Sequence, residues 1–328
     1  MKDRYIFGGG DSDGLLGISA ILSTIGDAFF SFTSPRTLHT EINNFVRGAS
    51  GRIYIVDLAL DQSTYRDLLR EIESLRGFRT YFFDQHNLPR GVSMEKLPFT
   101  KISIDDTVSS CENAYVETGC ELDVIVPAVA SINDGFKSTE LIRAAEKKHG
   151  ERLYRNAETL KFGLAFNIKD NKFKRELVYA IKEGEYPESI PELVSRYEQG
   201  LIRWEEIRCM AESRVKTAEK LAYGFFPNLR GGYANMLAGY LAEIGKKPVG
   251  ISILETDRVL QKINVISNNP LINLGQVVHD IAIAFGGAGG GSTSSAGATI
   301  NKRYTPDFLK RLDVNIRRLI INKFILNN

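Results

Sequence analysis

Short apolar runs alternate with helical patterns through the first 135 residues, and this alternation limits the fold more than any other feature of the chain. The runs have the length and composition of strands, and they lie at residues 4–7, 28–34, 51–60, 79–86 and 101–106. Between them, stretches such as TYRDLLREIESLRG at 64–77 repeat apolar side chains at helical spacing. Strands that alternate with helices of this length predict a mostly parallel sheet with helices on both faces. We therefore expect an α/β lobe at residues 1–136.

The remainder of the chain divides into a helical segment and a second α/β segment. Residues 137–222 are helical in pattern and rich in charge. Within 197–225 there is no glycine or proline between Gly200 and Gly224, which predicts one long connecting helix. Strand and helix patterns alternate again over 223–328. The sequence thus predicts an α/β fold of two lobes joined by helices, the C-terminal lobe being the smaller.

The composition is that of an ordinary globular protein. The 328 residues are enough for two domains with cores of their own, and 43% of them are hydrophobic. A formal net charge of +2 neither indicates nor excludes a nucleic-acid partner. The three cysteines form no CxxC pair, no apolar run reaches the roughly 18 residues of a membrane span, and the N-terminus lacks a signal-peptide pattern. We therefore expect a cytoplasmic protein with reduced thiols and no membrane partner.

Aspartates follow several of the predicted strands. Asp11 and Asp13 lie in a glycine-rich turn after the first strand, Asp57 ends RIYIVD, Asp84 ends RTYFFD, and Asp134 lies in SINDG. Any one of them could be a helix cap or a turn residue. Because ligands bind at the carboxyl ends of parallel strands, we expect the five to converge there, where like charges require a cation. Carboxylate oxygens suit Mn²⁺ or Mg²⁺, and paired metal ions serve phosphoryl displacement.

This ordered set of motifs resembles the DHH phosphoesterase superfamily, in particular its RecJ-like branch. The family's H-x-D-x-D-G motif appears here as GGDSDG at 9–14, and its D-H-H motif as DQH at 84–86. Its second and fourth motifs are single aspartates, matched by Asp57 and Asp134. The G-G-G-H-x-x-A-A-G signature of the companion DHHA1 module appears as GGGSTSSAG at 289–297. The resemblance covers most of the chain and implies a DHH-like lobe followed by a DHHA1-like lobe, with a cleft between them.

The resemblance also implies roles for individual residues. The expected ligands of Mn²⁺ or Mg²⁺ are Asp11, Asp13, Asp57, Asp84 and Asp134. The expected catalytic residues are Asp84 and His86, the latter meeting a phosphate. The expected substrate-binding residues are Gly289, Gly290, Gly291 and Ser292, in a glycine-rich run that could be merely flexible but whose position favours anion binding by backbone N–H groups.

Three departures from the family pattern remove imidazole groups. Gly9 stands in place of a metal-binding histidine, Gln85 in place of a histidine that ligates the second metal ion, and Ser292 in place of a histidine that meets the substrate. The carboxylates remain, so the resemblance implies weak metal binding and weakened catalysis.

Two functions remain open from the sequence. The loss of histidines resembles the RecJ-derived subunit of the replicative CMG helicase of archaea and eukaryotes, which implies a nucleoid-associated structural protein that binds GINS and MCM-type factors and contacts single-stranded DNA. We favour this function and expect the charged segment 137–222, around Trp204, to carry a partner surface, although a core position is the safer prediction for Trp204 itself. The alternative is an Mn²⁺- or Mg²⁺-dependent exonuclease that acts on single-stranded DNA or RNA.

Overall fold

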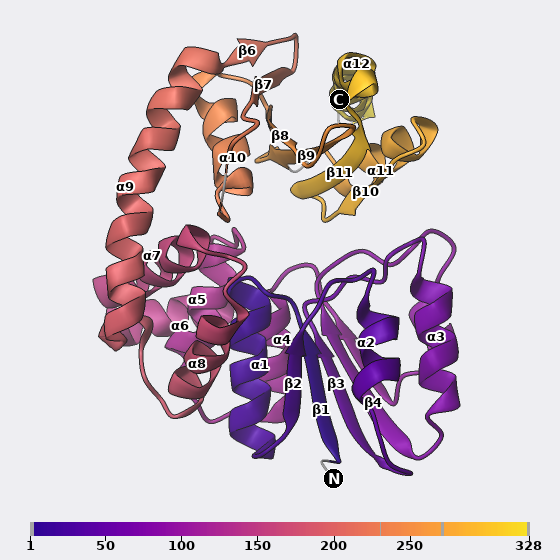
Figure 1. Ribbon diagram of the computed structural model, residues 1–328, viewed down its shortest axis with the longest axis vertical. Helices are drawn as coiled ribbons and strands as arrows, with labels where there is room; N and C mark the ends of the chain where they lie inside the picture. The colour runs from indigo at the N-terminus through magenta and orange to yellow at the C-terminus, as the bar shows by residue number, and fades with distance from the viewer. Residues whose placement is uncertain (1–2, 230, 270–271, 327–328) are drawn as a thin grey trace. The chain divides into compact units, whose positions relative to one another are not determined.

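The chain forms two compact units, residues 1–200 and 201–328, which we call the first and second units (Figure 1). The computed structural model describes residues 3–229, 231–269 and 272–326, with side chains described as far as residue 322. The sequence predicts domain boundaries near residues 136 and 222, and these boundaries remain a prediction.

The first unit contains a parallel sheet of five strands, as the sequence predicts. Its order is β2-β1-β3-β4-β5, and every neighbouring pair is parallel. The strands are β1 (Arg4–Gly8), β2 (Phe29–Phe32), β3 (Gly51–Val56), β4 (Phe78–Asp84) and β5 (Lys101–Ile104). The helices are α1 (Ser12–Ile25), α2 (Leu38–Phe45), α3 (Tyr65–Ser74), α4 (Ser110–Thr118), α5 (Ile125–Asn133), α6 (Glu140–His149), α7 (Glu151–Phe166) and α8 (Asn171–Lys182), with single 3₁₀ turns at Met94–Lys96 and Pro187–Ser189.

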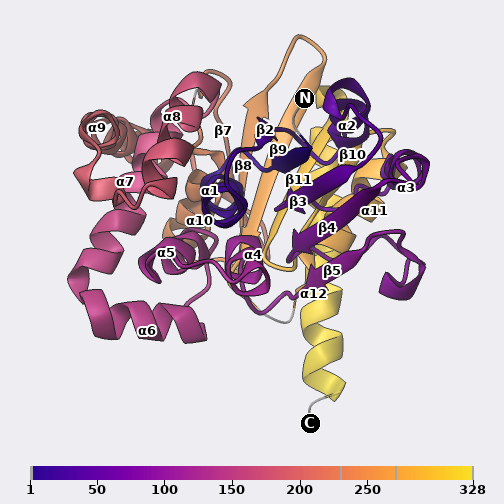
Figure 2. The same ribbon diagram turned by 90° about the horizontal axis from the view of Figure 1, so that it is seen from below.

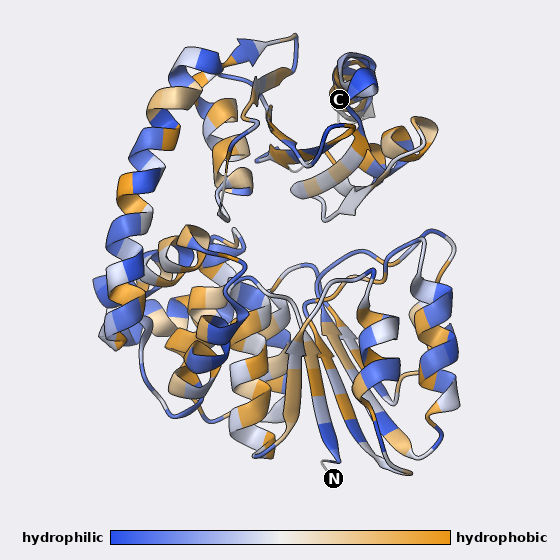
Figure 3. Cartoon of the chain, in the orientation of Figure 1, coloured by the Kyte–Doolittle hydropathy of each residue, from blue (hydrophilic) through white to orange (hydrophobic). Residues whose placement is uncertain are grey.

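Helices cover both faces of this sheet because neighbouring strand residues point to opposite sides. Ile6 and Val56 belong to one core, together with α1, α4 and α5. Phe7 and Ile55 belong to the other core, beneath α2 and α3. Figure 2 shows these helices on either side of the sheet, and Figure 3 shows hydrophobic residues along its strands. Burial on both faces accounts for the nearly continuous apolar runs.

The strand order positions the candidate site. In an order of 2-1-3-4-5, the connections after β1 and β3 leave the sheet in opposite directions, and ligands bind at such switch points. The turn with Asp11 and Asp13 follows β1, and Asp57 follows β3. The topology therefore places these aspartates where an α/β sheet usually holds a ligand.

The second unit contains a six-stranded sheet in the order β10-β11-β9-β8-β7-β6, in which β7 and β8 are parallel and the other pairs antiparallel. The strands are β6 (Lys216–Thr217), β7 (Leu221–Phe225), β8 (Val249–Glu255), β9 (Leu260–Ser267), β10 (Ala288–Gly291) and β11 (Ser295–Asn301). The helices are α9 (Pro191–Arg214), which spans the division between the units, α10 (Ala234–Ile244), α11 (Leu274–Ala284) and α12 (Thr305–Leu326), which follows a 3₁₀ turn at Lys302–Tyr304.

The structure differs from two local expectations for the second half of the chain. The connecting helix ends at Arg214, and the residues after it form β6 and β7, because Leu221 and Ala222 are fully buried in the sheet. The glycine-rich run, for which the composition also allowed a merely flexible segment, forms the hairpin of β10 and β11, in which Gly290 pairs with Gly297. Small residues tolerate a hairpin as well as a loop, so composition alone could not separate the two.

Trp204 packs against other aromatic rings of the second unit. Its ring is stacked on that of Tyr233 at 6.3 Å between centroids, and it lies edge-on to Tyr240 at 5.9 Å. Trp204 is half-buried, so these contacts hold it against the second unit without making it a fully buried core residue. Among the described residues, no helix is both long enough and apolar enough to cross a membrane.

Candidate metal centre

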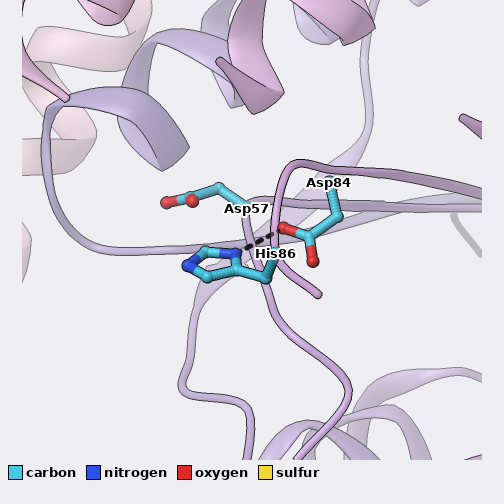
Figure 4. Close-up of side chains that lie close together, drawn as sticks. All are labelled: Asp57, Asp84 and His86. Atoms are coloured by element: carbon cyan, nitrogen blue, oxygen red, sulfur yellow. Dashed lines mark hydrogen bonds and ion pairs between the residues drawn. The ribbon is translucent and has the colours of Figure 1, made fainter. Parts of the chain in front are cut away.

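Three side chains at the ends of β3 and β4 lie close enough to share one metal ion. Asp57 follows β3, Asp84 ends β4, and His86 lies two residues farther on. Each offers one ligand atom, and these atoms lie within 4.8 Å of one another. Figure 4 shows the three side chains together, and we call them the Asp57–Asp84–His86 cluster. The sequence predicts Asp57 and Asp84 as metal ligands and His86 as a catalytic residue that meets a phosphate, and these roles remain predictions.

Asp84 orients the imidazole of His86. The His86 Nδ1 lies 2.8 Å from Asp84 Oδ1, which leaves Nε2 as the atom that His86 can offer to a metal ion or a phosphate (Figure 4). Burial lowers the pKa of His86, but the neighbouring Asp84 carboxylate outweighs it and raises the pKa to about 9. The raised pKa favours the protonated imidazole, a form that suits a phosphate oxygen.

Asp57 is held in a costly conformation. Its φ angle is +55°, in the left-handed region that residues other than glycine seldom adopt, and its side chain is buried. Burial, and then the charges of Asp11 and Asp13, raise the pKa of Asp57 well above its usual value. Strain of this kind is worth about 1–3 kcal/mol and is typical of functional sites.

Asp57 also explains the glycine at position 9. A Cβ on Gly9 would overlap Asp57 Oδ2, so the carboxylate fills the space that a side chain at position 9 would need. A histidine there could not be added without moving Asp57.

Asp13 has partners of its own within the first unit. Its two oxygens accept hydrogen bonds from the backbone N–H groups of Ser110 and Cys111, each at 2.9 Å. Burial raises the pKa of Asp13 to about 6, against the effect of these hydrogen bonds. The carboxylate thus anchors the first turn of α4 beside the metal centre. It keeps lone pairs for a metal ion, but its first role in this structure is to hold α4.

Asp11 and Asp134 lie at the solvent-exposed edge of the group of five aspartates. Both residues are exposed to solvent, unlike Asp13, Asp57 and Asp84. Asp11 caps α1, because its Oδ1 accepts from the N–H of Gly14 at 3.2 Å. Although Asp134 is exposed as a whole residue, burial of its carboxyl group, followed by the charges of Asp13 and Asp11, raises its pKa to about 8.

Gln85 ties together the carboxylates that lie away from the cluster. Its Nε2 donates to Asp134 Oδ2 at 2.5 Å and reaches Asp13 Oδ2 at 3.5 Å. Its Oε1 is buried and accepts no hydrogen bond. An unpartnered buried carbonyl oxygen is costly, and a bound cation is one kind of partner for such an oxygen. This orphaned oxygen and the raised pKa of Asp57 fit a divalent metal ion in this site.

Sequence reasoning missed two polar residues of the site. Ser110 Oγ lies 3.5 Å from Asp57 Oδ1 and 3.4 Å from Asp84 Oδ1, bridging two members of the cluster. Lys174 on α8 is 4% exposed, and its Nζ donates to the carbonyl of Gly10 at 3.0 Å. The ammonium group also lies 4.9 Å from the ring centroid of Phe32. No motif marks Lys174, which comes 164 residues after the turn that it supports.

The predicted substrate-binding residues lie in the second unit. Gly289, Gly290 and Gly291 are residues of β10, paired with β11, and Ser292 begins the turn between the two strands. The Ser292 Oγ accepts from the N–H of Ser295 at 3.1 Å. Half-buried His279, a helix residue as predicted, has its Nδ1 2.9 Å from the Gly289 carbonyl oxygen. The Gly289 carbonyl and the Ser292 hydroxyl are therefore already engaged in contacts within the second unit.

No protein-family model and no curated protein matches the sequence. Solved structures do share the fold. The DHH domain of a member of the s1p family of ribosomal proteins has a TM-score of 0.64 at 14% identity, over 96% of this chain and 86% of that one. The pGpG-specific phosphodiesterase PggH from Vibrio cholerae has a TM-score of 0.58 at 13% identity, over 97% of this chain and 99% of that one.

A third similar structure is RecJ from Thermus thermophilus in complex with Mn²⁺, with a TM-score of 0.64 at 16% identity. The match covers 97% of this chain and 52% of RecJ, so this chain spans about half the length of that protein. Similarity at these identities shows the fold alone. The chain has the two-lobed α/β fold that is also found in DHH-domain proteins such as RecJ.

Proposed function

We propose that this chain is a divalent-metal-dependent phosphodiesterase of the nuclease-like kind, acting on single-stranded nucleic acid through one well-formed metal position. The Asp57–Asp84–His86 cluster carries the proposal, because two carboxylates and an imidazole each bring one atom to within 4.8 Å of the others, on a strained and partly buried frame. The fold shared with manganese-bound RecJ and with a phosphodiesterase supports it.

The residues of the site have separate tasks in this proposal. Asp57 and Asp84 would hold Mn²⁺ or Mg²⁺. A bound divalent ion would supply Lewis-acid stabilisation of charge on the phosphodiester. His86, oriented through Nδ1 by Asp84, presents Nε2 to a phosphate oxygen. Asp11, Asp13 and Asp134 supply negative charge around the ion, and Gly289–Ser292 remain our proposed substrate-binding residues.

A hydrolysis assay tests the proposal. We expect the protein with Mn²⁺ to cleave labelled single-stranded DNA or RNA, or the dinucleotide pGpG as a small phosphodiester. Asp84→Asn should lower the rate by about a hundredfold or more, because it weakens a metal ligand and the orientation of His86. The matched control is Asp67→Asn, on the exposed side of α3, which should leave the rate unchanged. Absence of Mn²⁺-dependent cleavage of all three substrates would contradict the enzymatic proposal.

A specific observation favours a second function. Gln85 stands where the family pattern has a histidine, and its neutral amide donates a hydrogen bond to Asp134. A hydrogen bond in place of a metal ligand suits a site that is retained for structure more than for catalysis. The second candidate is therefore the structural subunit of a replicative helicase complex, with GINS and MCM-type factors and single-stranded DNA as partners. Inactivity in the assay, together with recovery of replication factors on the native protein, would favour this candidate.

Restoring one imidazole should strengthen the site. We expect Gln85→His to raise the affinity for Mn²⁺ by about tenfold, because a nitrogen ligand replaces an amide that occupies Asp134. Gly9→His should give no such gain, because its side chain would displace Asp57. Calorimetric titration with Mn²⁺ measures both. A stronger gain from Gly9→His than from Gln85→His would show that Asp57 moves freely.

A further inference from the structure

One face of the second unit's sheet is left partly uncovered. Helix α10 packs on one side of β7, β8 and β9, while α11 and α12 contribute to a core on the other side. Tyr223 and Phe225 are two residues apart on β7, so they share this second side, in line with Ile251 and Ile253 of β8. Phe225 is nevertheless 43% exposed, so the core stops short of the end of β7.

A cavity of about 880 Å³ lies over these aromatic residues. Its floor includes Tyr223, Phe225 and Ile253 from the sheet. The rest of the lining includes the start of α12, with Leu309, and the chain that follows α9, with Val215. All the residues that line the cavity belong to the second unit. A volume of this size suits a small organic ligand or a short stretch of a polymer.

Positive charge is concentrated around this cavity. Asp313 is the one carboxylate among the residues that line the cavity. Four cationic side chains line it, namely Arg214, Lys216, Lys302 and Lys310. The lining therefore carries a formal charge of +3, against +2 for the whole chain. Asp313 is already used locally, since its Oδ1 accepts from the N–H of Lys220 at 2.7 Å.

Most of these cations lack an acidic partner. Lys302 lies 3.7 Å from Glu255, but among the described residues Arg214, Lys216 and Lys310 form no ion pair with an acidic side chain. The Arg214 guanidinium lies 5.8 Å from the ring centroid of Phe226. Unpaired cations beside an apolar floor favour a ligand that is anionic at one part and flat and apolar at another.

We propose that this cavity binds single-stranded nucleic acid, with a base stacked on Phe225 and backbone phosphates held by Lys216 and Lys310. Exposed aromatic rings beside a basic track are the general means of binding single strands without sequence preference. An acidic peptide would satisfy the cations but would have no group that requires the aromatic floor. The inference rests on the proposed function for its class of ligand, and it adds a site that contains none of the metal-centre residues.

The test measures binding of a fluorescent oligothymidylate to the full-length protein in EDTA, so that the metal centre does not contribute. We expect Lys216→Glu with Lys310→Glu to weaken binding by tenfold or more and to reduce its dependence on salt, because two phosphate contacts are lost. Phe225→Ala should weaken binding by about fivefold or more, through loss of stacking. The matched control is Lys147→Glu with Lys172→Glu, exposed lysines of the first unit, which make the same change in net charge.

Each outcome bears on the inference separately from the metal centre. Equal losses in the control pair would overturn it in favour of unspecific charge attraction. No effect of Phe225→Ala, with poly-glutamate competing as well as the oligonucleotide, would overturn it in favour of an acidic protein partner. Failure of the wild-type chain to bind the oligonucleotide would also overturn it, while titration of Mn²⁺ on the same samples shows whether the proposed metal site stands.

Discussion

Saturation with Mn²⁺ should raise the midpoint of thermal unfolding of the first unit by about 5–10 °C. A ligand at a hundred times its dissociation constant contributes about 2.7 kcal/mol to the folded state. One kcal/mol shifts the midpoint of a domain of this size by about 2–4 °C. The reason for stabilisation lies in the metal-free site, where burial and the charges of Asp11 and Asp13 raise the pKa of Asp57. A divalent cation removes that repulsion. Differential scanning calorimetry with and without EDTA measures the shift.

The controls for this shift use the cluster itself. Asp84→Asn should abolish most of the Mn²⁺-dependent increase, whereas Asp67→Asn on α3 should keep it. If Asp84→Asn is stabilised as much as the wild-type chain, the ion binds elsewhere and the Asp57–Asp84–His86 cluster is not the metal site.

Gly14→Ala should destabilise the first unit by about 1–3 kcal/mol, the usual effect of forcing an extra carbon into a packed site. A Cβ on Gly14 would overlap the backbone of Gly9, and backbone atoms cannot move aside as a flexible side chain can. The Gly14 N–H also donates to Asp11, so the same displacement disturbs the start of α1. Urea unfolding followed by circular dichroism measures the loss, and titration with Mn²⁺ should show weaker binding.

Gly10→Ala is the matched control for this substitution. Its Cβ would meet Lys174 Nζ at 2.7 Å, which is the far end of a flexible side chain, so its effect on the free energy of unfolding should be clearly smaller than that of Gly14→Ala. Equal effects of the two substitutions would mean that the turn as a whole resists side chains, and that the contact between Gly14 and Gly9 is not special.

The fold of the first unit could be predicted because each of its strands is marked in the sequence by a short apolar run. Runs such as the one that ends at Val56 are apolar on both faces, and each stops at a polar residue where the sheet ends. The strand order then brings Asp57, Asp84 and His86 together as the sequence predicts. The β6 and β7 strands were missed because Lys216–Thr217 is very short and because the charged residues around it continue the helical pattern of α9.

The details of the site depend on contacts between distant segments, which a single sequence does not reveal. From the sequence, Gln85 is interpreted as the loss of a metal ligand. In the structure its side chain donates a hydrogen bond to Asp134, 49 residues away. Lys174 lies in an ordinary amphipathic helix, and only packing of α8 against α1 brings it to Gly10. The exclusion of a side chain at Gly9 depends on the left-handed backbone of Asp57, which spacing and composition do not encode.

The backbone at Asp57 also has a consequence for laboratory evolution. Glycine adopts a φ of +55° without penalty, and Asp57→Gly would remove a buried charge as well as the strain. A selection that rewards heat resistance alone should therefore discard this aspartate among the first, since stabilising changes commonly erase strained functional positions. Libraries selected for both heat resistance and metal-dependent function should instead keep Asp57 and gather their improvements elsewhere in the chain.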